Sequence, residues 1–348
     1  MKNLVKLGSL TSIRTGKLDA NASSENGKYP FFTCSKEPLR IDSYSYNCEC
    51  VLVAGNGDLN VKYYDGKFDA YQRTYIIEST DKSKLLVKYL YFFLDIYVEV
   101  LRTQSIGGVI KYIKLGNLTD AMIPLPSIEE QEVIVDHLEK CNDLLNRRIR
   151  QLAILDQLVK SRFIELFGDP VSNSYGLPEA TLSDLGEFGR GVSKHRPRND
   201  IKLLGGKYPL IQTGDVANAG LYITSYGNTY SELGLRQSKM WDKGTLCITI
   251  AANIAKTAIL EFDACFPDSV VGFIANERTN NIFIHYWFSF FQEILESQAP
   301  ESAQKNINLK ILSELKVIVP EKRKQDEFAS FVKLTDKSKL CSEMEVAA

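Results

Sequence analysis

The sequence has few of the residues that bind metals or form disulfide scaffolds. Its three histidines, His137, His195 and His285, lie far apart, and its seven cysteines include no CxxC spacing. Cys48 and Cys50 are separated by one residue and have no histidine near them. Because a structural zinc site needs a cluster of Cys or His ligands, we expect none here. The cysteines are typical of reduced thiols in a cytoplasmic protein.

Long apolar runs are also missing. No window approaches the roughly 18 apolar residues that a membrane-spanning helix requires, and the aromatic run at 89–94 is short and followed by Asp95. The first residues lead into a polar stretch and do not resemble a signal peptide. We therefore expect no membrane partner and a cytoplasmic location. With 348 residues, of which 44% are hydrophobic, the chain is long enough for two domains that each bury a core.

Motifs for catalysis are absent as well. The sequence contains no GxxxxGK phosphate loop, no GxSxG motif, and neither of the Asn-Pro-Pro-aromatic and Asp-Pro-Pro-aromatic tetrapeptides that a base amino-methyltransferase needs. Asp268, Glu314 and Lys316 loosely match a nuclease pattern, but an internal repeat places Thr74 and Met122 at the positions of Asp268 and Lys316. We therefore expect a binding protein with no catalytic residue, metal or cofactor of its own.

The chain repeats itself. Residues 52–131 match residues 246–325 at one offset of 194 (246 − 52), without a gap. Identical pairs at this offset include Lys62 and Lys256, Phe68 and Phe262, Asp69 and Asp263, Pro126 and Pro320, and Gln131 and Gln325. Earlier in the chain the offset is 175, so the second copy carries 19 additional residues (194 − 175) in its first part. Such a duplication predicts a pseudo-two-fold molecule that suits a two-part target.

A long helix is expected after the first copy. Ser127 and Glu130 form a capping-box pattern behind Pro126, and no proline or glycine follows until Gly168. Apolar residues recur at steps of three and four, as in a coiled coil, at Ile134, Leu138, Cys141, Leu145, Ile149, Leu152, Leu155, Val159, Phe163 and Leu166. At 1.5 Å per residue this is a rod of roughly 60 Å, which needs a partner helix unless it is an ordinary amphipathic core helix.

The repeat supplies that partner helix. A second helix is expected from Glu321 to about Cys341, roughly half the length of the first, with Phe328 and Val332 at the positions of Ile134 and Leu138. A pseudo-two-fold axis would make the two helices antiparallel. The sequence therefore predicts an α+β fold with globular parts at 1–126 and 172–320, a central helix at 127–171 and a distal helix at 321–348.

Positive charge is concentrated in a few loops. Because the net charge is only −1, a nucleic-acid surface has to be local, and the most basic stretch is 190–198, where Gly191 and Pro197 favour a loop. The cations that we expect to contact DNA are Arg14, Lys17, Lys28, Lys62, Arg73, Arg190, Lys194, Arg196, Arg198, Lys207, Arg236 and Lys256. Amides that could pair with adenine edges are Gln104, Gln212, Asn228, Gln237 and Gln304.

The block at 123–131, Ile-Pro-Leu-Pro-Ser-Ile-Glu-Glu-Gln, and the long helix that ends in Phe-Gly-Asp-Pro at 167–170 resemble the central region of specificity subunits of type I restriction–modification systems. Residues 303–307, 317–320 and Gln325 resemble the same block in the second copy. One departure is Ile110, which stands where the second copy has Gln304. The likeness covers nearly the whole chain.

The resemblance implies that each globular copy is a target recognition domain that reads one half of an interrupted double-stranded DNA sequence. It further implies that the helices act as a ruler and dock two modification subunits, which carry S-adenosylmethionine and methylate adenine. Restriction subunits that use ATP and Mg²⁺ would then join. The residues that would pack the helices or dock partners are Ile134, Leu138, Leu145, Leu152, Leu155, Val159, Phe328 and Val332. Two alternatives remain: a protein-interaction adaptor, or half of a fused restriction–modification enzyme.

Overall fold

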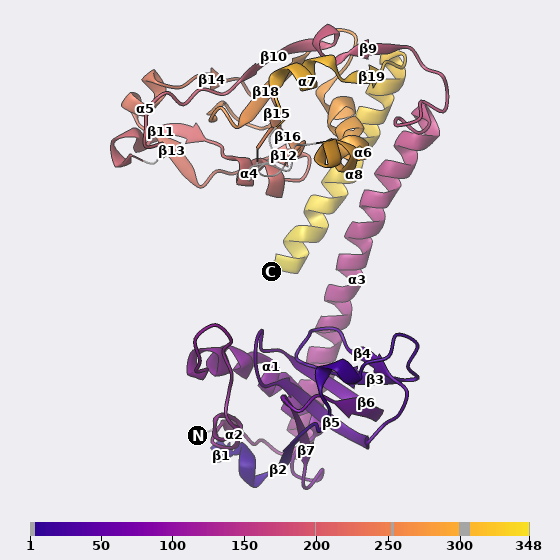
Figure 1. Cartoon of the computed structure of the whole chain (residues 1–348), viewed down its shortest axis with the longest axis vertical. Helices are drawn as coiled ribbons and strands as arrows, with labels where there is room; N and C mark the ends of the chain where they lie inside the picture. Colours follow the sequence, from indigo (N-terminus) through magenta and orange to yellow (C-terminus); the bar gives the residue numbers. More distant parts are fainter. Residues whose placement is uncertain (1–3, 199, 252–253, 299–306, 348) are drawn as a thin grey trace. The chain divides into compact units, whose positions relative to one another are not determined.

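A computed structural model describes residues 4–198, 200–251, 254–298 and 307–347, shown as a ribbon in Figure 1. The chain divides into two compact units, Met1–Asn146 and Arg147–Ala348. The division falls inside one long helix, α3 (Ile128–Phe167), so each unit combines a globular part with a stretch of that helix. Both globular parts mix helices with sheet, which confirms the predicted α+β class.

The first unit is built on a six-stranded sheet in the order β2-β7-β5-β6-β3-β4. Neighbouring strands are antiparallel except β3 and β6, which are parallel. The strands are β2 (Thr11–Thr15), β3 (Tyr29–Phe32), β4 (Leu39–Ile41), β5 (Tyr46–Ala54), β6 (Val61–Ala70) and β7 (Thr74–Ser79). A separate ribbon pairs β1 (Leu4–Lys6) with β8 (Met122–Pro124), and the short helix α2 (Leu115–Thr119) precedes β8.

The central strand β5 is buried on both faces. Successive side chains of a strand point to opposite faces, so Val51 and Val53 enter the core beneath α1 (Val87–Gln104). Cys50 and Leu52 enter a second core on the other face. The apolar residues of α1 recur at helical spacing and cover the first core, and this burial on two faces makes β5 the centre of the unit.

The second unit contains two sheets, in the orders β10-β18-β15-β16-β12 and β13-β11-β17-β14. Their strands are β10 (Gly186–Arg190), β11 (Leu204–Leu210), β12 (Tyr222–Ile223), β13 (Asn228–Tyr230), β14 (Met240–Trp241), β15 (Leu246–Thr249), β16 (Thr257–Leu260), β17 (Ala264–Cys265) and β18 (Val270–Ala275). The ribbon β9 (Glu179–Thr181) with β19 (Lys316–Ile318) closes the unit. The helices are α4 (Thr213–Asn218), α5 (Glu232–Arg236), α6 (Asn281–Gln298), α7 (Leu309–Glu314) and α8 (Lys322–Ala347).

The strand pairing confirms the internal repeat. In the ribbon of the first copy Lys6 pairs with Met122, and in that of the second copy Thr181 pairs with Lys316, which are the matching positions at offsets of 175 and 194. One residue further on, the amide of Leu7 donates to the carbonyl of Ala121 (2.8 Å). The equivalent bond from Leu182 to Leu315 measures 2.9 Å. The two compact units therefore have the same backbone arrangement at these positions.

The assumption of one gapless offset is wrong in the central strands. Val51 pairs with Ile77, whereas Leu246 pairs with Phe273, so the equivalent positions differ by 195 (246 − 51) and 196 (273 − 77). Leu246 faces the helix-covered core, as Val51 does, while Leu52 faces the opposite core. A shift of one residue turns a side chain to the other face of a sheet. The core that each side chain enters therefore shows that Val51, and not Leu52, is the counterpart of Leu246.

The central helix α3 begins as its sequence predicts. The amide of Ser127 donates to the Glu130 carboxylate (3.0 Å), and the amide of Glu130 donates to the Ser127 hydroxyl (3.3 Å), which completes the capping box. The helix has 40 residues. The distal helix α8 has 26 residues and extends to Ala347, so the predicted end near Cys341 and the estimate of half the length of α3 were wrong.

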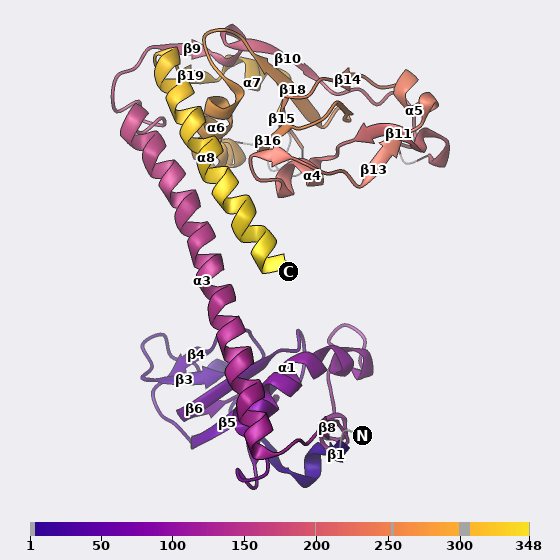
Figure 2. The ribbon, with the colours of Figure 1, turned by 180° about the vertical axis from the view of Figure 1, so that it is seen from behind.

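Within the second unit, α8 packs antiparallel to the end of α3, as Figures 1 and 2 show. Arg162 on α3 pairs with Glu327 at 2.8 Å, and Asp156, earlier on α3, pairs with Lys339, later on α8. Phe163 and Phe328 meet edge to face with ring centroids 5.4 Å apart. The predicted antiparallel helix pair is confirmed here, and Phe328 and Val332 are buried in it together with Val159.

The continuous apolar seam predicted along α3 was wrong. Ile134 and Leu145 are 36% and 39% exposed, and Ile149 is 60% exposed, whereas Val135 is the buried apolar residue of the first turns. Leu138, Leu152 and Leu155 are half-buried. The reason is that α3 changes neighbours: it packs on the core of the first unit near its start and on α8 near its end. The exposed residues do not pack the chain internally, and their role in partner docking stays a prediction.

None of the described helices is long and apolar enough to cross a membrane.

Candidate nucleic-acid interface

The basic loop, residues 190–198, leaves the end of β10 in the second unit. Gly191 is required where the loop begins, because a Cβ there would lie 2.2 Å from the carbonyl oxygen of Phe266. The amide of Gly191 donates to the carbonyl of Val270 (2.9 Å), which ties the start of the loop to β18. The fold therefore fixes the point from which the cations project.

Residues after α5 hold the backbone of the basic loop. The amide of His195 donates to the side-chain oxygen of Gln237 (3.0 Å), and the amide of Lys194 donates to the Gln237 carbonyl (3.4 Å). The hydroxyl of Ser238 donates to the carbonyl of Val192 (2.7 Å). Gln237, predicted as a base reader, thus has its acceptor engaged within the chain, which favours a structural role for it.

Two arginines of the basic loop converge on one carboxylate. Arg198 lies 2.5 Å and Arg196 3.7 Å from the oxygens of Asp268. Arg196 also donates to the carbonyls of Ser193 (2.6 Å) and His195 (2.9 Å), which braces the loop from within. The side chains of Arg198, Arg196 and Asp268 are 46%, 56% and 36% exposed, so this charge cluster faces solvent.

The carboxylates of the loose nuclease pattern have partners of their own. Asp268 is the counter-ion of the two arginines, and Glu314 lies 3.9 Å from Lys310 on α7. Within the described ranges no group of three or more His, Cys, Asp or Glu side chains could hold a metal ion.

The other cations predicted in the second unit lie in different environments. Arg190 and Lys194 are exposed on the basic loop, and Arg236 is exposed at the end of α5, directly before Gln237. Lys207 is exposed but lies 3.6 Å from Glu232, and Lys256 is only half-exposed. The structure thus brings Arg190, Lys194, Arg196, Arg198 and Arg236 to one region and leaves Lys207 and Lys256 elsewhere.

The predicted cations of the first unit divide into two groups. Lys17, Lys28 and Arg73 are exposed. Arg14 pairs with Glu78 at 2.5 Å and lies over the ring of Tyr46. Lys62 donates to Asn60, and burial lowers the pKa of its amine. The internal partners of Arg14 and Lys62 favour structural roles for them.

Lys17 and Arg73 lie on adjoining segments of the first unit. The amide of Gln72 donates to the carbonyl of Leu18 (2.9 Å), and Leu18 pairs with Tyr71 in a parallel bridge. Two exposed cations therefore flank one backbone contact: Lys17 lies in the loop that leaves β2, as the basic loop leaves β10, and Arg73 lies in the turn before β7. Of the predicted base readers, Gln304 lies outside the described residues.

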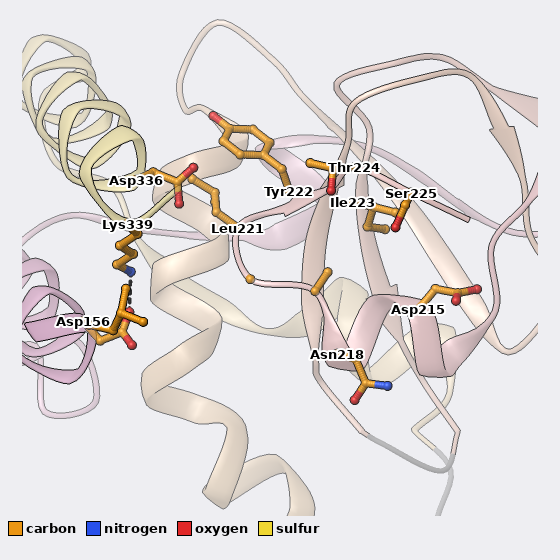
Figure 3. A pocket seen from close by; sticks show the side chains of 13 residues that line it. Asp156, Asp215, Asn218, Leu221, Tyr222, Ile223, Thr224, Ser225, Asp336 and Lys339 are labelled. Carbon is orange, nitrogen blue, oxygen red and sulfur yellow. Dashed lines mark hydrogen bonds and ion pairs between the residues drawn. The ribbon is translucent and has the colours of Figure 1, made fainter. Parts of the chain in front are cut away.

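The second unit contains a cavity of about 510 Å³ between α3, α4, α8 and the segment around β12 (Figure 3). Its charged lining consists of Asp156, Asp215, Asp336 and Lys339, and Lys339 pairs with Asp156. Burial raises the pKa of the Asp336 carboxyl, although the nearby Lys339 partly offsets this rise. Three carboxylates and one paired lysine give this cavity a net negative charge, which disfavours phosphate.

Comparison with known proteins identifies the family. Residues 2–153 and 178–343 match the Type I restriction modification DNA specificity domain, one match for each copy. The chain belongs to this family. It is 39% identical over 158 residues to the type I restriction enzyme EcoDI specificity subunit of Escherichia coli, a match that covers 45% of this chain and 34% of that protein. This chain therefore spans about a third of the EcoDI subunit.

Solved structures agree on the fold. The type I restriction–modification S subunit from M. genitalium has a TM-score of 0.66 at 19% identity, covering 99% of this chain and 92% of that one. A chain from a structure of complex assembly in the type I restriction–modification system has a TM-score of 0.56 at 14% identity, with 99% and 92% covered. The resemblance seen in the sequence is confirmed, and the fold of the specificity-subunit family extends over the whole chain.

Proposed function

We propose that this chain is the DNA sequence-specificity subunit of a type I restriction–modification complex and that it reads an interrupted, two-part target in double-stranded DNA. The observation that carries the proposal is the duplication itself. Two units have the same backbone scaffold, and each begins its helix with a buried glutamine, Gln131 or Gln325. A scaffold used twice, with different loops on each copy, suits two unlike half-sites at a fixed separation.

The two copies differ in the length of the segment between two paired strands, β3–β4 in the first copy and β11–β13 in the second. The hairpin β3–β4 pairs Tyr29 with Ile41, and the hairpin β11–β13 pairs Tyr208 with Tyr230. The second pair encloses ten more residues than the first (21 − 11), and α4 and β12 lie within this longer segment. A common interior with unlike surface segments supports the reading of two different sequences.

The second copy would bind DNA through the basic loop. Arg190, Lys194, Arg196 and Arg198 would contact phosphates and set the register, while neighbouring loops read base edges. Each correct base contact would contribute on the order of 1–3 kcal/mol to discrimination. In the first copy the exposed cations Lys17, Lys28 and Arg73 would have the same role.

The chain would act without catalytic residues and would guide partner subunits. Modification subunits that bind S-adenosylmethionine would methylate adenine, and restriction subunits that use ATP and Mg²⁺ would join them. The later half of α3 supports docking of these partners: Ile154 and Leu158, one helical turn apart on the same side, are 57% and 47% exposed. Apolar side chains gathered on a solvent-facing helix mark an interaction surface.

Methylation mapping tests the proposal. The methylome of the native host would be read with long-read sequencing in the presence and absence of this gene. We expect loss of N6-methyladenine at one interrupted two-part motif when the gene is deleted. An expressed gene whose deletion leaves the methylome unchanged would contradict the proposal. That result would favour a protein-interaction adaptor, the alternative that the exposed face of α3 also fits.

A further inference from the structure

The two units contain the same turn next to the loop that leaves the first strand of each sheet. In the first unit the amide of Thr74 donates to the carbonyl of Tyr71 (2.8 Å), and Gly16 donates to the carbonyl of Thr74 (3.0 Å). This places the turn 71–74 directly against the start of the loop that carries Lys17. A Cβ on Gly16 would lie 2.0 Å from the Ala70 carbonyl oxygen, so the approach is close.

The second unit repeats these bonds. The amide of Val270 donates to the carbonyl of Pro267 (3.0 Å), and Gly191 donates to the carbonyl of Val270 (2.9 Å). The turns 71–74 and 267–270 therefore occupy one structural position, and Gln72 is the counterpart of Asp268. A neutral side chain stands beside the loop of the first copy, and an anion stands beside the basic loop of the second.

That anion occupies the groups that would bind DNA. Asp268 accepts from Arg198 at 2.5 Å and lies 3.7 Å from Arg196. A carboxylate and a phosphate offer a guanidinium the same planar pair of acceptors. In the DNA-free chain the Asp268 carboxylate therefore fills the place that a phosphate oxygen would take.

We propose that Asp268 is a positioning residue of the DNA interface that competes with phosphate for Arg196 and Arg198 and so weakens binding to non-target DNA. This inference rests on the proposed function. The competition is mild because all three side chains are substantially exposed and screened by water. Lower affinity for non-target DNA keeps the complex free to reach its target among many competing sites.

The test uses the full chain assembled with its modification subunits and a fluorescently labelled duplex of scrambled sequence. Binding is measured by anisotropy between about 50 and 200 mM salt. Asp268→Asn is expected to tighten binding by about two- to fivefold, the effect of an exposed ion pair. The slope of log K against log salt should become steeper by about one phosphate contact, because more counterions are released.

Three matched variants separate competition from other effects. Glu314→Gln removes the same charge on α7, next to Lys310, and should change binding less. Asp268→Glu keeps the charge and should keep the native salt slope. Arg196→Ala with Arg198→Ala in the Asp268→Asn background should abolish the gain, because the gain acts through these arginines.

The outcomes distinguish this inference from the proposed function. If the native complex binds no duplex DNA, the proposed function fails and the inference falls with it. If the native complex binds and Asp268→Asn binds equally or more weakly with an unchanged melting temperature, only the inference is overturned. Weaker binding confined to one sequence would instead make Asp268 a reader of a base.

Discussion

The first and second copies of the repeat hold their helices in the same way but present different charges at the same turn. The side-chain amide of Gln131 donates to the carbonyls of Lys84 (2.8 Å) and Pro126 (3.0 Å). The side-chain amide of Gln325 donates to the carbonyls of Arg278 (3.1 Å) and Pro320 (2.8 Å). These partners lie at one offset of 194 (278 − 84 and 320 − 126), so the bonds that the two glutamines donate at the junction between globular part and helix are preserved to the residue.

The turns 71–74 and 267–270 show the opposite behaviour. Their backbone bonds match, yet Gln72 is neutral and Asp268 holds two arginines. The interior of the scaffold tolerates little change, because a buried polar group has to keep its partners. The exposed turn accepts a new charge at little cost, and this freedom suits the proposed reading of two different sequences.

We expect the largest loss of stability from a substitution where α3 packs against α8 in the second unit. Phe163 is fully buried and meets the rings of Phe167, Phe283, Phe290 and Phe328. Phe163→Ala should lower the stability of the second unit by about 3–5 kcal/mol, since a large cavity opens. Hydrogen exchange by mass spectrometry should show faster exchange in residues 147–347 alone. The matched exposed variant Ile149→Ala should have almost no effect, and equal effects would refute the packing described.

The second prediction tests the shared junction. Gln325→Ala would leave the part-buried carbonyl of Arg278 and the buried carbonyl of Pro320 without their donor and cost about 2–4 kcal/mol in unfolding free energy. Gln131→Ala should cost the first unit a similar amount. Urea denaturation followed for each unit measures both. Gln151→Ala, on the exposed part of α3, is the control, and a loss no larger than this control's would show that the junction is not a stabilising feature.

The third prediction concerns DNA affinity. Arg196→Ala with Arg198→Ala should weaken binding about tenfold for every duplex sequence and reduce the salt slope by about 0.9 for each lost phosphate contact. Anisotropy titrations over a salt series measure both quantities. Lys207→Ala with Lys256→Ala removes the same charge away from the basic loop and should do less. An unchanged salt slope would remove the basic loop from the interface.

The smallest change in DNA affinity is expected from a substitution that gives the turn 71–74 the charge of the turn 267–270. Gln72→Asp would place an anion next to Arg73 and near Lys17, which imitates Asp268 in the first copy. Binding to scrambled duplex should weaken by about two- to fivefold, as for a single exposed ion pair. Gln72→Asn is the neutral control. Equal binding by the Asp and Asn variants would mean that this turn of the first copy does not approach DNA.

Much of the architecture could be predicted because its signals are local. The capping box at Ser127 and the absence of helix breakers before Gly168 define α3 from the sequence alone. The internal repeat aligned Gln131 with Gln325 and predicted a second helix after Pro320. The face of α3 that is buried could not be predicted, because it depends on which neighbour each turn meets: Val135 is buried where Ile134 was expected.

The site was predicted less completely. The basic stretch 190–198 identified the cations, but linear sequence did not show that Asp268, some 70 residues away, joins them. The offset that aligned Asp268 with Thr74 was two residues out in this region, which hid the correspondence with Gln72. Strand register, which depends on burial and on pairing, was needed to align the two turns.

Under the proposed function, each copy reads one half of the target. Because Glu179 and Ile318 pair at the ends of the ribbon β9–β19, residues 179–318 can be exchanged as a block for those of another specificity subunit of the family. The methylome of cells carrying this chimera is the most direct test. We expect one half of the two-part motif to change, while the other half and the gap stay the same. A change in both halves, or an unchanged motif from an assembled complex, would show that the second copy does not read one half of the motif.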